Sequence, residues 1–133
     1  QLQEMYVTPS LLAGKVWDLI AESAKWSRAN ANTLVDTHWV GGDPAKLEVY
    51  GWASWSPRKG ILTLRNPSDK PQRMTVDLRE IFELPRGAAQ AYVARSPWQA
   101  DRNQSAMTLI AGQKHTFDLR PFQVMTLEAV PRR

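Results

Sequence analysis

The sequence has no cysteine among its 133 residues. A disulfide framework, a thiolate zinc site and a cysteine nucleophile are therefore excluded. The absence does not fix the compartment, because a bacterial exported protein can also lack cysteine, and a secreted or periplasmic location in a bacterium fits the sequence. No stretch approaches the roughly 18 apolar residues of a membrane span, so no membrane partner is expected. The first residues, Gln-Leu-Gln-Glu, show neither the basic nor the apolar region of a signal peptide.

The sequence also lacks any concentration of one charge. It carries 17 Lys and Arg against 13 Asp and Glu, a net charge of +4. Nucleic-acid binding needs basic residues gathered on one face or stripe. Here single basic residues alternate with acidic ones through the second half, and only Arg132-Arg133 forms a basic end. The pattern predicts a solvated surface of mixed sign and no nucleic-acid partner.

The first third of the chain has the period of an amphipathic helix. The polar positions are Lys15, Asp18, Glu22, Lys25 and Asn32, and the apolar positions are Leu12, Val16, Leu19, Ile20, Ala24, Ala31 and Leu34. Thr8-Pro9 is a suitable start signal, and Gly14 breaks the pattern early. The spacing predicts a helix from about Lys15 to Asn30 with a wide apolar face.

From Leu47 onward the period changes to two, which predicts about seven short strands. They are expected at Glu48–Trp55, Gly60–Arg65, Gln72–Asp77, Ala89–Arg95, Ala106–Ile110, Gln113–Leu119 and Phe122–Ala129. Short strands at close spacing, with no helical period between them, favour an antiparallel arrangement. The predicted fold class is therefore mainly β: an antiparallel β-sandwich of about seven strands preceded by an N-terminal amphipathic helix. The best local hairpin joins Ala106–Ile110 to Gln113–Leu119 through Ala111-Gly112.

The predicted helix has no helical partner for its apolar face. Its stripe of Val16, Leu19, Ile20 and Ala24 is costly to leave in water, at about 25 cal/mol per Å² of apolar area. We therefore expect the helix to dock on the sandwich or to self-associate with a second copy of the chain. Alternatively, the helix packs on something absent from this chain, which makes the chain a fragment.

Several strand-forming stretches share a pattern with one enzyme family. Val49–Trp55 combines aromatic and small residues, Gly60–Ser68 alternates apolar residues and ends in Asn-Pro-Ser, and His115–Glu128 has a proline before a closing apolar strand. Together with Gln72–Leu78, these stretches resemble the C-terminal sandwich of α-galactosidase-like (melibiase-type) glycoside hydrolases. In that family the sandwich follows a (β/α)₈ barrel. The predicted helix and Leu34–Asp36 resemble the last helix and strand of that barrel.

The resemblance implies two parts: residues 1–46, the remnant of a catalytic barrel, and residues 47–133, the β-sandwich domain. It implies the upstream barrel of the same parent chain as a partner. The family's two catalytic carboxylates lie on earlier barrel strands that this sequence lacks, so no catalytic residue and no cofactor are expected here. As the end of a barrel strand, Asp36 would lie with His38 and Trp39 on the face where barrel enzymes build their sites, in contact with the sugar. A linker whose Trp39 packs on the sandwich stays an alternative.

An independent catalytic or metal site finds little support in the residues. A glycosidase needs two carboxylates across one bond, and the close acids in an irregular loop are Asp36 and Asp43, with Glu48 beyond. The favoured interpretation is that Asp36 ends a strand or caps a turn and that Asp43 starts the Asp-Pro turn. His38 beside Asp36 is incomplete as a metal site, since a metal typically needs three or four protein ligands, and His115 lies on an alternating strand. No metal site is predicted.

The chain has six tryptophans, and sugar-binding proteins use aromatic faces against pyranose rings. Alternation along the first predicted strand puts Trp52 and Trp55 on opposite faces of the sheet. We expect one of them in the core and the other buried under the N-terminal segment near Thr37–Gly42. Trp98, in a predicted long loop, is the better candidate for an exposed aromatic residue.

These observations favour a non-catalytic accessory β-sandwich that supports the catalytic barrel of a glycoside hydrolase. The alternative is a carbohydrate-binding module that holds a glycan through exposed tryptophan. The candidate substrate-binding residues are Asp36, His38, Trp39 and Trp98. A third hypothesis is a small enzyme that uses Asp36, His38 and Asp43.

Overall fold

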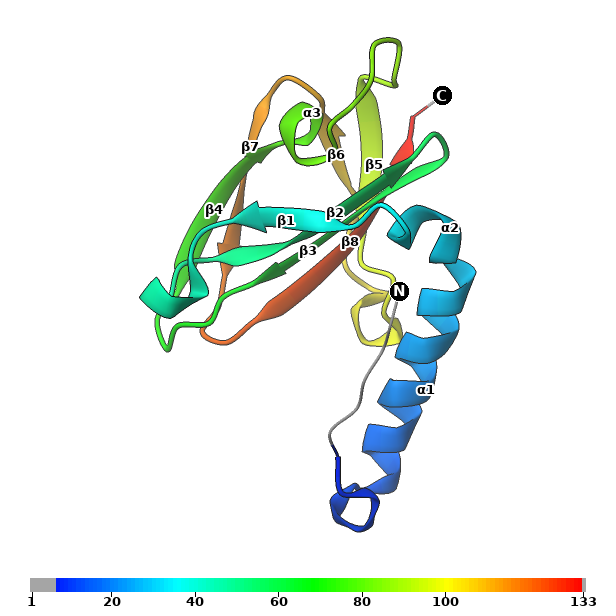
Figure 1. The fold of residues 1–133 in the computed structure, drawn as a ribbon, viewed down its shortest axis with the longest axis vertical. Helices are drawn as coiled ribbons and strands as arrows, with labels where there is room; N and C mark the ends of the chain where they lie inside the picture. The colour runs from blue at the N-terminus through cyan, green and yellow to red at the C-terminus, as the bar shows by residue number, and fades with distance from the viewer. Residues whose placement is uncertain (1–6, 133) are drawn as a thin grey trace.

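The protein consists of two antiparallel sheets and a long helix that projects from one end of the larger sheet (Figure 1). This computed structural model describes residues 7–132. The strands are β1 (His38–Gly41), β2 (Tyr50–Ser56), β3 (Lys59–Arg65), β4 (Gln72–Asp77), β5 (Ala91–Arg95), β6 (Met107–Ile110), β7 (Lys114–Leu119) and β8 (Val124–Pro131). The helices are α1 (Gly14–Ala29), α2 (Ala31–Leu34) and α3 (Leu78–Ile81), with 3₁₀ turns at Pro9–Leu11, Pro44–Lys46 and Gln99–Asp101. The predicted fold class is confirmed.

The larger sheet has the strand order β1-β2-β3-β8-β5-β6, and β4 pairs with β7 in the smaller sheet. All seven predicted strands are present, with ends within two residues of the prediction. The last strand, β8, lies between β3 and β5. It therefore joins two groups of strands that precede it in the chain.

The predicted hairpin between Ala106–Ile110 and Gln113–Leu119 is wrong. Strand β6 pairs with β5 in the larger sheet and β7 pairs with β4 in the smaller one, so the chain changes sheets at the link between them. Side chains hold this corner: the Gly112 N–H donates to Asp77 Oδ1 at 2.7 Å, and the Ile110 N–H donates to His115 Nε2 at 2.8 Å. The short link suits a hairpin turn, but burial of the apolar faces decides which strands pair.

The core lies between the inward faces of the two sheets. Leu62 and Leu64 of β3 and Leu127 of β8 line it from the larger sheet, while Phe117 and Leu119 of β7 line it from the smaller one. Opposite residues in an antiparallel pair share a face, so the register β2-β3-β8 keeps these side chains in continuous rows. Helix α3 contributes further buried residues to the same core.

Helix α1 is attached to the larger sheet at its C-terminal end, where Trp26 Nε1 donates to Glu128 Oε1 at 2.6 Å and Asn30 Nδ2 donates to the same oxygen at 3.1 Å. A further bond holds its middle to the loop between β5 and β6, because Glu22 Oε1 accepts from the Gln99 N–H at 2.8 Å. None of the residues of α1, all of which the structure describes, is buried, and 37% of Val16 and 53% of Leu19 are exposed. The expectation that the apolar stripe docks on the sandwich is therefore wrong for Val16 and Leu19, whereas Ile20 and Ala24 are partly buried. Docking on a second copy stays a prediction.

The prediction of a barrel strand at Leu34–Asp36 is also wrong. Leu34 ends the short helix α2, and a turn follows. Thr37 Oγ1 donates to the Leu34 carbonyl at 2.7 Å and lies 2.8 Å from Ser54 Oγ, so hydrogen bonds hold this turn on β2. The chain then enters β1, which was not predicted. Strand β1 lies within residues 1–46 and pairs with β2 of the sandwich.

Trp52 and Trp55 lie on opposite faces of β2, as predicted. Trp55 packs against the core, and its Nε1 donates to Tyr92 Oη at 3.3 Å. Trp52 lies beside Trp39, which belongs to the expected segment Thr37–Gly42, but 40% of the Trp52 side chain is exposed. The expectation of burial is wrong for Trp52, because this segment adds an edge strand next to β2 and not a layer above it.

Candidate functional site

Three aromatic side chains gather on the outer face of the larger sheet, and we call Trp39, Tyr50 and Trp52 the aromatic cluster. Trp39 lies on β1 directly opposite Trp52 on β2. The rings of Trp39 and Tyr50 are stacked, with centroids 4.9 Å apart and planes 6° apart, and Trp52 meets both edge-on at 5.6 and 5.5 Å. Tyr50 is buried, whereas 48% of Trp39 and 40% of Trp52 are exposed. The cluster therefore presents two fixed indoles to solvent.

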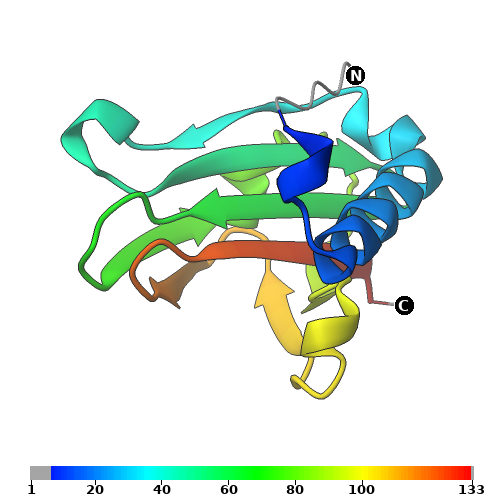
Figure 2. The ribbon, with the colours of Figure 1, turned by 90° about the horizontal axis from the view of Figure 1, so that it is seen from below.

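Polar side chains continue the same face across the next two strands. The register places Thr63 opposite Trp52, Thr126 opposite Thr63, and Arg65 opposite Tyr50. The hydroxyls of Thr63 and Thr126 lie 3.2 Å apart, within hydrogen-bond distance. Figure 2 shows β1, β2, β3 and β8 side by side on this face, with α1 standing before one end. Thr126 is buried, Thr63 is partly buried and Arg65 is exposed. The face thus joins exposed rings to one guanidinium and one partly buried hydroxyl.

The four predicted site residues do not converge on one place. Asp36 is exposed in the turn between α2 and β1. His38 Nε2 lies 2.8 Å from the Ile81 carbonyl, a bond that links β1 to α3. Trp98 is partly buried against Trp26, with ring centroids 5.1 Å apart, and is not the exposed aromatic that we expected. Only Trp39 belongs to the aromatic cluster.

The acidic side chains of the loop after β1 make their contacts within that loop. Asp43 Oδ1 accepts from the Ala45 N–H at 2.9 Å, and its Oδ2 lies 3.9 Å from Lys46 Nζ. Glu48 Oε2 accepts from the Asp43 N–H at 2.8 Å. These bonds cap the 3₁₀ turn at Pro44–Lys46 and close the loop. The contacts of Asp43 are those of a turn residue.

A partly buried polar group fixes α1 to the sheet. Lys59 Nζ donates to Glu128 Oε2 at 2.8 Å and to Asn30 Oδ1 at 2.9 Å. With the bonds from Trp26 and Asn30 to the other Glu128 oxygen, four side chains share one network. We call Trp26, Asn30, Lys59 and Glu128 the helix–sheet junction. Each donor finds a carboxylate or amide oxygen, so the junction is a structural element.

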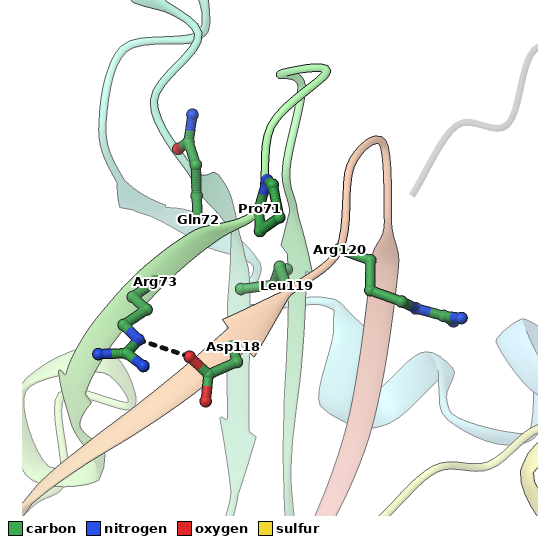
Figure 3. A pocket seen from close by; sticks show the side chains of 6 residues that line it. All are labelled: Pro71, Gln72, Arg73, Asp118, Leu119 and Arg120. Atoms are coloured by element: carbon green, nitrogen blue, oxygen red, sulfur yellow. Dashed lines mark hydrogen bonds and ion pairs between the residues drawn. The ribbon is translucent and has the colours of Figure 1, made fainter.

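A surface hollow near the start of β4 and the end of β7 is shown in Figure 3. Arg73 Nε donates to Asp118 Oδ1 at 2.6 Å, but 78% and 74% of these side chains are exposed. Gln72 and Arg120 point away from this ion pair (Figure 3). An exposed pair contributes little to stability, and the hollow gathers no set of converging polar groups. It is not a candidate for chemistry.

Within residues 7–132, no three His, Cys, Asp or Glu side chains gather where they could hold a metal ion. Among the helices that the structure describes, none has the length and apolar character needed to cross a membrane. The aromatic cluster is therefore the surface feature that we consider further.

Sequence reasoning missed Tyr50 and the exposure of Trp52. A signal was present, since Tyr50 and Trp52 are two residues apart on a strand and therefore share a face. The part played by Trp39 could not be predicted in this way, because Trp39 reaches Trp52 through β1, a strand that was not predicted.

Comparison with known proteins supports the fold. No family model and no curated protein matches the chain. A solved structure from Bacillus halodurans, assigned as an α-N-acetylgalactosaminidase, is similar with a TM-score of 0.55 and 17% identity, over 72% of this chain and 21% of that chain. A β-L-arabinopyranosidase of glycoside hydrolase family 27 from Geobacillus stearothermophilus aligns with a TM-score of 0.47 and 20% identity, over 64% of this chain and 18% of that chain.

The chain shares its fold with one part of a glycoside hydrolase, and it spans about a fifth of the length of the Bacillus halodurans chain. The resemblance to α-galactosidase-like enzymes, first noted in the strand patterns, is thereby confirmed for the fold. Low identity over a partial match leaves activity to be argued from this chain's own residues.

Proposed function

We propose that the chain is a non-catalytic accessory β-sandwich of an α-galactosidase-like glycoside hydrolase, and that it supports the catalytic barrel of the same parent chain. Helix α1 carries this proposal. Val16, Trp17 and Leu19 are 37%, 39% and 53% exposed, although the helix–sheet junction fixes the other end of the helix. An amphipathic helix that is held toward its C-terminal end and exposes apolar side chains toward its N-terminal end suits packing against a second body. The partial fold match to a larger glycosidase agrees with this role.

The acidic residues support a role without catalysis. Glycosidases hold two carboxyl groups roughly 5 to 9.5 Å apart across the bond that they cleave. In this chain Asp36 lies exposed in a turn, and Asp43 and Glu48 bind backbone N–H groups of their own loop. The third hypothesis, a small enzyme built on Asp36, His38 and Asp43, also loses support, because His38 bonds to the Ile81 carbonyl.

The first prediction concerns activity. We expect the purified chain to release no nitrophenol from p-nitrophenyl α- or β-glycosides, because Asp43 and Glu48 are engaged by N–H groups of their own loop and do not form the carboxylate pair that a glycosidase needs. The parent protein is expected to hydrolyse such a substrate, and the coding region that precedes this chain in frame is expected to encode a barrel. Turnover by the chain alone that disappears in Asp36→Asn or Asp43→Asn would overturn the proposal, as would a parent gene that encodes no barrel.

A second candidate function is glycan binding, which the exposed indoles of Trp39 and Trp52 favour. The two candidates are compatible, because the aromatic cluster and the apolar side chains of α1 are separate surfaces. Asp36 and Trp98 lie outside the cluster and remain predictions as sugar contacts.

A further inference from the structure

We propose that the aromatic cluster is a platform for the ring face of a pyranose in a glycan. The inference deepens the glycan-binding candidate and rests on it, while the accessory role does not depend on it. The ligand would lie on the exposed indoles of Trp39 and Trp52, which form the outer face at β1 and β2. The site is thus distinct from Trp98, the residue that the sequence suggested first.

The rings are held in place before any ligand arrives. Tyr50 is only 8% exposed and lies stacked against Trp39, with the planes 6° apart. Trp52 braces both rings from the side, at centroid distances of 5.6 and 5.5 Å. A prearranged surface loses little side-chain entropy when a ligand binds. Each contact between the three rings therefore favours a fixed binding surface.

The groups beside the rings match the chemistry of a sugar. A pyranose carries C–H bonds on its ring face and hydroxyls around its rim, so its face packs on an aromatic ring while its rim needs polar partners. Thr63 lies opposite Trp52, Thr126 follows in the same row, and Arg65 lies opposite Tyr50. Aromatic lining with a few placed polar groups is the usual composition of a small-ligand site. Arg65 is exposed and Thr63 is partly buried, so one guanidinium and one hydroxyl can serve the rim while the indoles serve the face. Thr126 is only 4% exposed and supports Thr63 from below.

The same neighbours argue against a protein interface at this place. A stable interface covers about 800 Å² on each partner and has an apolar centre. Here the apolar surface of Trp39 and Trp52 gives way within one strand to Thr63 and Arg65. The next exposed apolar side chain, Val124, lies beyond Arg65 on β8. Two indoles beside a polar row are large enough for one or two sugar rings and too small for the centre of a protein interface.

Affinity electrophoresis tests the proposal on the intact chain. The gels contain galactomannan, xyloglucan or polygalacturonate, and the migration of the protein is compared with that in a gel without polysaccharide. We expect at least one polysaccharide to retard the wild type, and Trp39→Ala and Trp52→Ala to weaken this retardation at least tenfold. Trp17→Ala is the matched control, because Trp17 is 39% exposed but lies on α1, outside the cluster. It is expected to behave like the wild type.

Two further measurements distinguish loss of the binding surface from misfolding of a variant. Trp39→Phe retains a ring and should recover part of the binding lost in Trp39→Ala. In the wild type, the indole N–H resonances of Trp39 and Trp52 should shift on addition of the retarding polysaccharide while that of Trp17 stays fixed, which needs no variant to fold. The proposal is overturned if no polysaccharide retards the wild type, or if Trp17→Ala loses binding equally. It is likewise overturned if the cluster variants instead weaken contact with the parent barrel. The accessory role is tested separately, by the assay with p-nitrophenyl glycosides, and none of these binding results changes its outcome.

Discussion

Asn66 is the residue on which two loops of the sandwich depend. Its side chain is fully buried, and Nδ2 donates to the carbonyls of Lys70 at 2.7 Å and Arg120 at 2.9 Å. Its Oδ1 accepts from the Ser68 N–H at 3.0 Å. One amide therefore ties the turn after β3 to the loop between β7 and β8. This explains why an asparagine stands at the end of that strand.

Removing this amide leaves the buried Ser68 N–H without this acceptor and removes the bonds to the carbonyls of Lys70 and Arg120. We expect Asn66→Ala to lower the free energy of unfolding by about 2–4 kcal/mol, measured by urea denaturation. Asn103→Ala, at an exposed loop position, should stay within about 0.5 kcal/mol of the wild type. Equal midpoints for the two variants would show that the loops do not depend on Asn66.

The tryptophans of β2 should differ in the same assay. Trp55 packs against the core and bonds to Tyr92, so Trp55→Ala opens a cavity and should cost about 3 kcal/mol. Trp52 is 40% exposed and loses only its edge contacts, so Trp52→Ala should cost about 1 kcal/mol. Thermal and urea unfolding of both variants measure the difference. A larger loss for Trp52 would mean that the exposed face is covered in solution.

Among the elements, α1 depends on the helix–sheet junction. Glu128→Ala removes the shared acceptor of Trp26, Asn30 and Lys59 at once. The indole N–H of Trp26 then loses its bond, while Asn30 and Lys59 each keep one bond within the junction. We expect a loss of about 2 kcal/mol in the free energy of unfolding and faster proteolysis within α1. Glu80→Ala, at an exposed position, is the control. Unchanged proteolysis in Glu128→Ala would contradict the role of the junction.

The seven strands could be predicted because apolar, β-branched and aromatic residues gather between clear turn signals. Strand β1 escaped because its four residues lie in a stretch with two glycines and Asp43-Pro44, which predicts a loop. The hairpin prediction failed for another reason: the link Ala111-Gly112 suits a tight turn, but sheet membership follows long-range burial that local sequence does not record. The site could be predicted only in part, since Trp39 was named for a barrel rim and meets Tyr50 and Trp52 on the sandwich instead.

At the scale of the whole molecule, the free length of α1 should govern association. Without a second body to cover Val16 and Leu19, we expect the isolated chain to self-associate through this face as its concentration rises. Sedimentation velocity should show a shift toward the monomer for the double variant Val16→Glu, Leu19→Glu. Lys25→Glu changes charge at an exposed position of the same helix and should not have this effect. A chain that stays monomeric at every concentration would remove the helix as a contact between copies.

The central place of β8 has a consequence for synthesis. Strands β1 to β3 and strands β5 and β6 acquire their shared partner only when residues 124–131 have left the ribosome, because β8 pairs with both β3 and β5. Until then, the pairing edges of β3 and β5 stay open, and such open edges are where nascent chains aggregate. The larger sheet is therefore completed only after β8 has been made, and this strand determines when the sandwich becomes a folded unit.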